Sequence, residues 1–112
     1  MQLHSKVVIY LLAAGALVYL PSMSHAAEAG DAKAVFEANG CTSCHAPSAK
    51  LVGPALKAIA KRYKGKAVSA EIAQRIKAGS VGRWGDMQHS ANESISEDDA
   101  ALVARWILRG AP

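Results

Sequence analysis

The chain has 112 residues, of which 51% are apolar, 20% are charged and 5% are aromatic, and its formal net charge is +4. This length allows one small domain, and the composition excludes collagen-like, low-complexity and disulfide-rich classes. Alanine accounts for 19 of the 86 residues that follow Ala26, so few large apolar side chains remain for a core. Domains of this size commonly need additional stabilisation, such as a disulfide or a bound metal. We therefore expect something besides side chains to complete the core.

Residues 1–26 match the pattern of a secretory signal peptide. A short polar start precedes the uncharged run 7–20, and the small residues Ser24 and Ala26 indicate cleavage after Ala26. The run is shorter than the roughly 20 residues that span a bilayer, which leaves a retained membrane anchor as the less favoured alternative. We therefore expect export to an oxidising compartment and a mature domain of residues 27–112 without stable membrane insertion.

Helical spacing of apolar residues, without the alternation typical of strands, predicts an all-α fold for the mature chain. The first helix is expected at Asp31–Asn39, with Asp31 capping its first turn and Gly40 ending it. The second is expected to begin at Pro54, which suits the first helical position, and to run to about Tyr63.

Two further helices follow in the second half of the chain. The third is expected to begin at Ser69 and to end before Gly79. The fourth is expected to begin at Ser96 and to end before Gly110, with Asp99 three residues after Ser96 in a variant of the capping box. About four helices are thus expected in total.

Cys41, Cys44 and His45 form the pattern C-x-x-C-H, which is the attachment signature of c-type haem. The spacing suits this chemistry, because two thiols add to the two vinyl groups of the porphyrin and the following imidazole reaches the iron. A thiol redox pair, a zinc site and a short disulfide are the alternatives. They are disfavoured because no strand precedes Cys41, zinc requires four ligands, and the disulfide closes a very small loop. We therefore expect one covalently bound haem c, which also supplies missing core surface.

A long loop without periodicity, residues 80–95, separates the last two helices, and loops of this length usually have a function. It contains Met87 and His89, which are the one methionine and the one histidine besides His45 in the mature chain. Thioether and imidazole are the usual second axial ligands of haem iron. We expect the sixth ligand to come from this loop.

Most of the mature chain resembles, in order, the small bacterial class I cytochromes c. Besides the attachment motif, the matching segments are Val52–Ala55, Ala73–Ser80, Gly82–Gly85, Ser96–Asp99 and Trp106–Leu108. The resemblance implies the class I cytochrome c fold, with about four helices wrapped around one covalently attached haem. It also implies an electron carrier between redox proteins and no enzymatic activity.

The resemblance implies roles for residues outside the attachment motif. Pro54 supplies the backbone carbonyl that accepts a hydrogen bond from the second ring nitrogen of His45. Arg75 and Trp84 occupy positions that contact a haem propionate. In the family, a residue at the position of Asn92 hydrogen-bonds the sulfur of the axial Met.

The chain departs from the family where the axial Met is expected. Aligned without gaps, His89 occupies that position and Met87 lies two residues before it. Gln88 and Ser90 replace the flanking prolines. We therefore predict His/His ligation through His45 and His89, which lowers the reduction potential relative to thioether ligation. Met87 in a shifted loop, or an open position, is the alternative.

Five basic residues cluster near the end of the expected second helix: Lys57, Lys61, Arg62, Lys64 and Lys66. Cations at a helix end complement the helix dipole, and they also suit a docking patch for an acidic redox partner. The mature chain has twelve Lys and Arg against nine Asp and Glu, a net charge of +3. This charge is too small to indicate a nucleic-acid partner.

Two other functions stay open at this level. One is a haem protein with a labile sixth ligand that binds small ligands or acts like a peroxidase, since a loop without its prolines releases His89 more easily. The other is a thiol oxidoreductase without haem, built on Cys41 and Cys44. The electron carrier is favoured because the sequence shows no group of acidic and basic residues that resembles a catalytic site.

Overall fold

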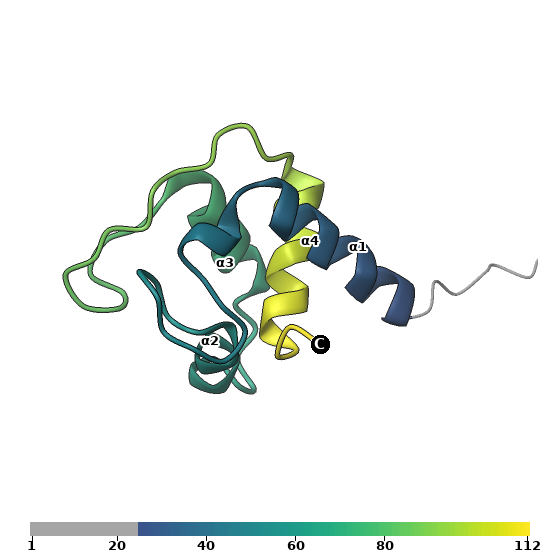
Figure 1. Ribbon diagram of the computed structural model, residues 1–112, viewed down its shortest axis with the longest axis horizontal. Coiled ribbons are helices and arrows are strands. Elements are labelled where there is room, and N and C mark those ends of the chain that lie inside the picture. Colours follow the sequence, from purple (N-terminus) through teal and green to yellow (C-terminus); the bar gives the residue numbers. More distant parts are fainter. Residues whose placement is uncertain (1–24) are drawn as a thin grey trace, which may run out of the picture.

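The computed structural model describes residues 25–112, which form four α-helices, one 3-10 turn and no β-strand (Figure 1). The elements are α1 (His25–Ala38), η1 (Cys41–Ser43), α2 (Leu56–Arg62), α3 (Ser69–Ala78) and α4 (Glu97–Leu108). The all-α prediction is confirmed. Nearly all of the expected signal segment lies outside the described residues, so its cleavage after Ala26 stays a prediction. Within residues 25–112, no helix has both the length and the apolar character needed to cross a bilayer.

Helix α4 packs against α1, α2 and α3, and within residues 25–112 these three do not pack closely against one another. Figure 1 shows α4 crossing α1 in the middle of the domain. At the crossing, the rings of Phe36 and Trp106 lie 5.4 Å apart between centroids, with planes inclined by 57°. Leu56 of α2 and Val103 of α4 are each only 1% exposed beside them. The predicted apolar face of the last helix is therefore the centre of the core.

Helix α1 begins six residues before the predicted start, and the expected cap at Asp31 is wrong because Asp31 lies inside the helix. Ala32 is completely buried in the core. Glu28, in the first turn, pairs with Arg105 at 3.1 Å and with Arg109 at 3.8 Å, both near the end of α4. These contacts with a distant helix, together with alanine's helical preference, extend α1 beyond the local capping signal.

Helix α2 begins at Leu56, so the expectation that Pro54 opens the helix is also wrong. The amide of Leu56 donates to the carbonyl of Ala46 at 3.0 Å, and the amide of Lys57 donates to the carbonyl of Pro47 at 3.1 Å. The preceding loop therefore satisfies the first amides of the helix, which leaves no need for a side-chain cap.

Helices α3 and α4 lie where the sequence predicts them. Gly79 directly follows α3. The Ser96 hydroxyl accepts a hydrogen bond from the Asp99 amide at 3.0 Å, as expected of a capping residue. Both boundaries are set by local chemistry, which explains why sequence patterns locate them.

The loop 80–95 extends away from the helices and returns to α4 (Figure 1). Its two arms are joined by a pair of backbone hydrogen bonds, from Ser80 N to His89 O at 3.0 Å and from His89 N to Ser80 O at 2.8 Å. Gly79 has a φ of +78°, and a Cβ at this position would lie 2.6 Å from the carbonyl oxygen of His89. The returning arm therefore requires glycine here both for conformation and for space.

We expect Gly79→Ala to destabilise the domain by about 2 kcal/mol or more, because it adds a backbone clash to a left-handed conformation. Gly82→Ala is the matched control, since Gly82 has a φ of +69° and open space around its missing Cβ. The control should lose only about 1 kcal/mol. Denaturant unfolding measures both losses, and equal losses would contradict the role given to the contact with His89.

Candidate functional site

The attachment motif folds into one tight turn directly after α1. The amides of Cys44 and His45 both donate to the carbonyl of Cys41, at 3.2 and 3.0 Å. Gly40, with a φ of +72°, turns the chain out of α1 into η1. No disulfide joins the two cysteines. The turn brings both thiols and the imidazole to the wall of one cavity.

This cavity has a volume of about 940 Å³, and the attachment turn and the loop 80–95 both contribute to its wall. Apolar side chains from all four helices also line it: Phe36, Leu56, Ile59, Ile72, Val103 and Ile107. The core that the alanine-rich sequence leaves incomplete is therefore open at this position. A large apolar group bound here would bury these side chains further.

The imidazole of His45 is oriented by the backbone on two sides. Its Nδ1 lies 2.8 Å from the carbonyl oxygen of Pro54, the contact that the family resemblance implies. Because a carbonyl only accepts, Nδ1 carries the proton and Nε2 keeps its lone pair for a metal ion. A Cβ on Gly53 would lie 2.5 Å from Cε1 of the ring, so the imidazole rests directly against the Gly53 backbone.

The imidazole of His89 lines the same cavity and is half-buried. Its Nδ1 is buried without a hydrogen-bond partner. Burial, and then electrostatic repulsion between the protonated forms of His89 and His45, lower the pKa of His89, and a backbone hydrogen bond with Ser90 offsets part of this decrease. The neutral imidazole that results is the form that binds metal ions.

The separation of the two imidazole centroids is compatible with one metal ion between the rings. Rings that bind opposite faces of an ion through bonds of about 2 Å have centroids about 6 Å apart. The centroids of His45 and His89 are 5.9 Å apart, with planes inclined by 37°. Met87, the other expected candidate, also lines the cavity and is 56% exposed. The residues present therefore fit a haem whose thioether bonds form at Cys41 and Cys44.

The thiol chemistry agrees with attachment better than with redox exchange. The pKa of Cys41 is raised, mainly by burial and to a lesser extent by the neighbouring Cys44, although a backbone hydrogen bond offsets part of the increase. Thiol oxidoreductases instead lower the pKa of their attacking cysteine. The arrangement disfavours a thiol oxidoreductase built on this pair.

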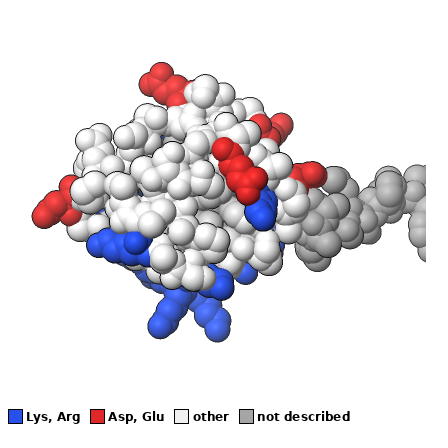
Figure 2. Space-filling model, viewed as in Figure 1, with Lys and Arg blue, Asp and Glu red and all other residues white. Residues whose placement is uncertain are grey.

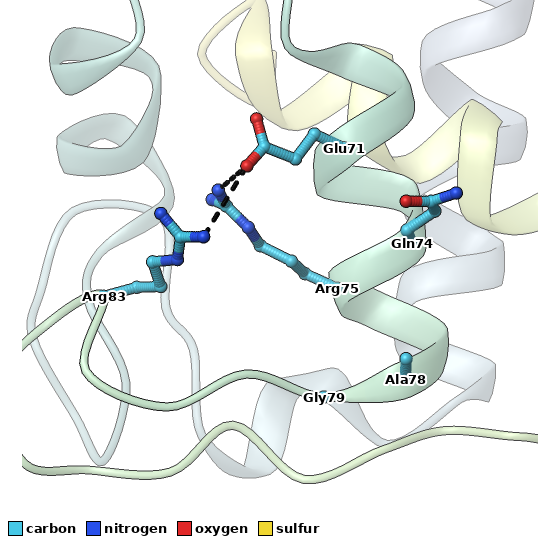
Figure 3. A pocket seen from close by; sticks show the side chains of 6 residues that line it. All are labelled: Glu71, Gln74, Arg75, Ala78, Gly79 and Arg83. Carbon is cyan, nitrogen blue, oxygen red and sulfur yellow. Dashed lines mark hydrogen bonds and ion pairs between the residues drawn. The ribbon is translucent and has the colours of Figure 1, made fainter.

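Arg75 also lines the cavity, but its guanidinium group already has protein partners. Its Nη1 donates to the Tyr63 hydroxyl at 3.1 Å, and its Nη2 donates to Glu71. The carboxylate of Glu71 also lies 3.8 Å from Nη2 of Arg83. Figure 3 shows dashed lines from this carboxylate to both guanidinium groups. The propionate contact expected of Arg75 stays a prediction.

Trp84 lines the cavity and packs against the core. The guanidinium carbon of Arg62 lies 4.4 Å from the centroid of the Trp84 ring, and Arg62 also donates to the carbonyl of Arg83. The sequence shows Arg62 only as one member of a basic cluster. No local pattern indicates a contact with a residue so far along the chain.

Asn92 holds the end of the loop. Its side-chain oxygen accepts from the Ser94 hydroxyl at 2.8 Å and from the Ile95 amide at 3.3 Å, and its side-chain nitrogen donates to Asn39 at 3.4 Å. These partners differ from the contact with an axial ligand that the resemblance implies. The bond to Asn39 connects this end of the loop to the segment between α1 and η1, and nothing in the sequence pairs these residues.

Comparisons with known proteins agree with the site. The sequence model of the cytochrome c family matches residues 29–110. The chain is 42% identical over 99 residues to cytochrome c-551 of Pseudomonas aeruginosa, covering 88% of this chain and 89% of that protein. It is 45% identical over 71 residues to cytochrome c-552 of Nitrosomonas europaea, covering 62% of this chain and 69% of that protein. The crystal structure of the Nitrosomonas europaea cytochrome c552 is similar, with a TM-score of 0.65, 42% identity, and coverage of 68% of this chain and 95% of that one.

The chain belongs to the cytochrome c family, as one of its small class I members. It binds one haem c covalently through Cys41 and Cys44, and it is an electron carrier rather than an enzyme. The expected fold, cofactor and general function are therefore confirmed.

We expect Gly53→Ala to raise the reduction potential by tens of millivolts, where about 60 mV is a tenfold change for one electron. The added Cβ displaces the imidazole of His45 and weakens its bond to the Pro54 carbonyl, which makes it a poorer donor to ferric iron. Redox titration measures the shift. Gly30→Ala is the control, because a Cβ there meets nothing within 4 Å. An unchanged potential in Gly53→Ala would contradict this role for the Gly53 backbone.

Proposed function

We propose that this protein is a periplasmic monohaem cytochrome that carries single electrons between redox proteins, with His45 and His89 as axial ligands. One observation carries the ligand assignment. Both His89 and Met87 line the cavity, but the imidazole of His89 has its centroid 5.9 Å from that of His45, and Met87 is 56% exposed. Aligned without gaps to the family pattern, His89 also falls at the position of the axial Met, which supports the proposal.

Different residues of the protein hold the haem, orient its ligand and shield it from water. Bound haem supplies an iron that alternates between the ferric and ferrous forms. Cys41 and Cys44 tether the group, and Pro54 keeps the imidazole of His45 in one orientation. The apolar helices limit access of water. Two imidazoles favour ferric iron more than imidazole with thioether, so we infer a lower potential than in Met-ligated relatives.

We infer export from the signal-peptide pattern of residues 1–26, with cleavage after Ala26 and a mature chain of residues 27–112. The periplasm provides the oxidising compartment in which such exported proteins reside.

We further propose that an acidic redox partner docks at a basic surface of four exposed lysines: Lys57, Lys61, Lys64 and Lys66. Figure 2 shows Lys and Arg side chains gathered at the lower end of the molecule, while most Asp and Glu lie higher. Arg62 belongs to the same sequence cluster, but its guanidinium lies over Trp84. The lysines therefore provide the free positive charge for steering a partner.

Ferric wild-type protein should lack the red-region absorption band that sulfur-to-iron charge transfer produces. Met87→Ala should leave the spectrum and the potential unchanged. His89→Ala should give a high-spin spectrum, because it removes the second axial ligand. A charge-transfer band in the wild-type protein would contradict His/His ligation. Rapid binding of carbon monoxide to reduced wild-type protein would instead support a ligand-binding or peroxidase-like function with a labile sixth ligand.

The rate of electron exchange with an acidic redox protein should fall by about tenfold between low and physiological ionic strength. Charge reversal in the double variant Lys61→Glu and Lys64→Glu should remove most of this dependence. Lys33→Glu on α1 reverses an exposed charge outside the basic surface and serves as the control. Stopped-flow kinetics at several salt concentrations measure the slopes. The same slope in wild type and double variant would remove this surface from the docking proposal.

A further inference from the structure

The arm of the loop that precedes His89 is exposed to solvent along much of its length. Val81 is 66% exposed and Met87 is 56% exposed. Backbone hydrogen bonds between Ser80 and His89 hold the two arms together at the base. Beyond this base, side chains from α2 and α3 contact the loop at Arg83 and Trp84.

Arg62, the last residue of α2, makes two of these contacts. Its guanidinium carbon lies 4.4 Å from the centroid of the Trp84 ring, within the range of a cation–π interaction. The same group donates a hydrogen bond from Nη1 to the backbone carbonyl of Arg83. One side chain therefore binds both a ring and a main-chain atom of the loop.

Helix α3 contributes a second connection at the same place. The Glu71 carboxylate lies 3.8 Å from the guanidinium of Arg83 and also binds Arg75, as Figure 3 shows. Arg83 is thus held through its carbonyl by α2 and through its side chain by α3. The Glu71 contact is an exposed ion pair and contributes little by itself.

The chemistry of Arg62 suits this position. A guanidinium group is planar, so it stacks on an indole while its edge still donates hydrogen bonds, whereas a lysine ammonium cannot do both. The residue also lies in the last turn of α2, where positive charge complements the helix dipole. In the basic cluster it is the single arginine, beside four lysines.

We propose that Arg62 is a positioning residue that fastens the ligand-bearing loop to α2. It acts through Trp84 and the Arg83 carbonyl, and it keeps the loop closed over the cavity. This inference rests on the proposed function in one respect, namely that the loop supplies the sixth ligand. The fastening itself is independent of whether His89 or Met87 is that ligand.

Amide hydrogen exchange of the haem-loaded protein tests the proposal. The amides of Ser80 and His89 are bonded across the loop and report its opening. Arg62→Ala should accelerate their exchange by about tenfold, because it removes a cation–π contact and a charge-assisted hydrogen bond. Arg62→Lys, which keeps the charge without the planar group, should exchange nearly as fast as Arg62→Ala. Lys61→Ala removes one charge from the preceding residue and should exchange like the wild type.

A second readout follows the haem directly. Binding of carbon monoxide to the reduced protein requires departure of the sixth ligand, so its rate should rise in Arg62→Ala by a factor similar to that of the exchange. The amides of Val103 and Ile107 in α4 are an internal reference for global unfolding and should keep their protection. Equal acceleration of loop and α4 amides would overturn the proposal, because it would indicate general destabilisation.

Two further results would also overturn it. The first is that the amides of Ser80 and His89 exchange no faster in Arg62→Ala than in Lys61→Ala. The other is full restoration in Arg62→Lys, which would show that charge alone is sufficient. The spectra of His89→Ala and Met87→Ala test the ligand assignment separately. Failure of that assignment would leave the exchange experiment valid, and failure of the exchange experiment would leave the ligand assignment standing.

Discussion

The cavity that haem fills is the constraint on which the rest of this small domain depends. Within residues 25–112, α1, α2 and α3 each pack against α4 but not closely against one another, so their free faces border the cavity. Side chains alone leave this core incomplete. The covalent bonds at Cys41 and Cys44 keep the haem permanently in place, and the haem completes the core. The same group therefore provides both the redox chemistry and much of the buried apolar surface.

Main-chain contacts fix the imidazole of His45 and the backbone of His89, and each histidine has a glycine beside it. The ring of His45 rests against Gly53 and is bonded to a backbone carbonyl. The backbone of His89 passes so close to Gly79 that a Cβ would meet its carbonyl oxygen. Because main-chain contacts lose little conformational freedom, they hold the imidazole of His45 and the backbone of His89 more reproducibly than contacts between long side chains would.

The sequence predicts those features that local chemistry determines. The capping serine of α4, the glycine after α3 and the attachment motif are each recognisable within a few residues. The starts of α1 and α2 depend instead on distant groups, namely the Glu28 pairs with α4 and the carbonyls of Ala46 and Pro47. The contact of Arg62 with Trp84 is equally distant. The sequence shows Arg62 as one of five neighbouring basic residues, and nothing in it indicates the contact with the Trp84 ring.

The backbone pair between Ser80 and His89 has a consequence for how such proteins diversify. These two hydrogen bonds fix the path of the chain at position 89 without using the side chain of that residue. Under the proposed ligation by His89, a change of side chain there would alter the atom offered to the iron while the loop keeps its course. Substitution of one residue would then change the reduction potential and leave the attachment turn as it is.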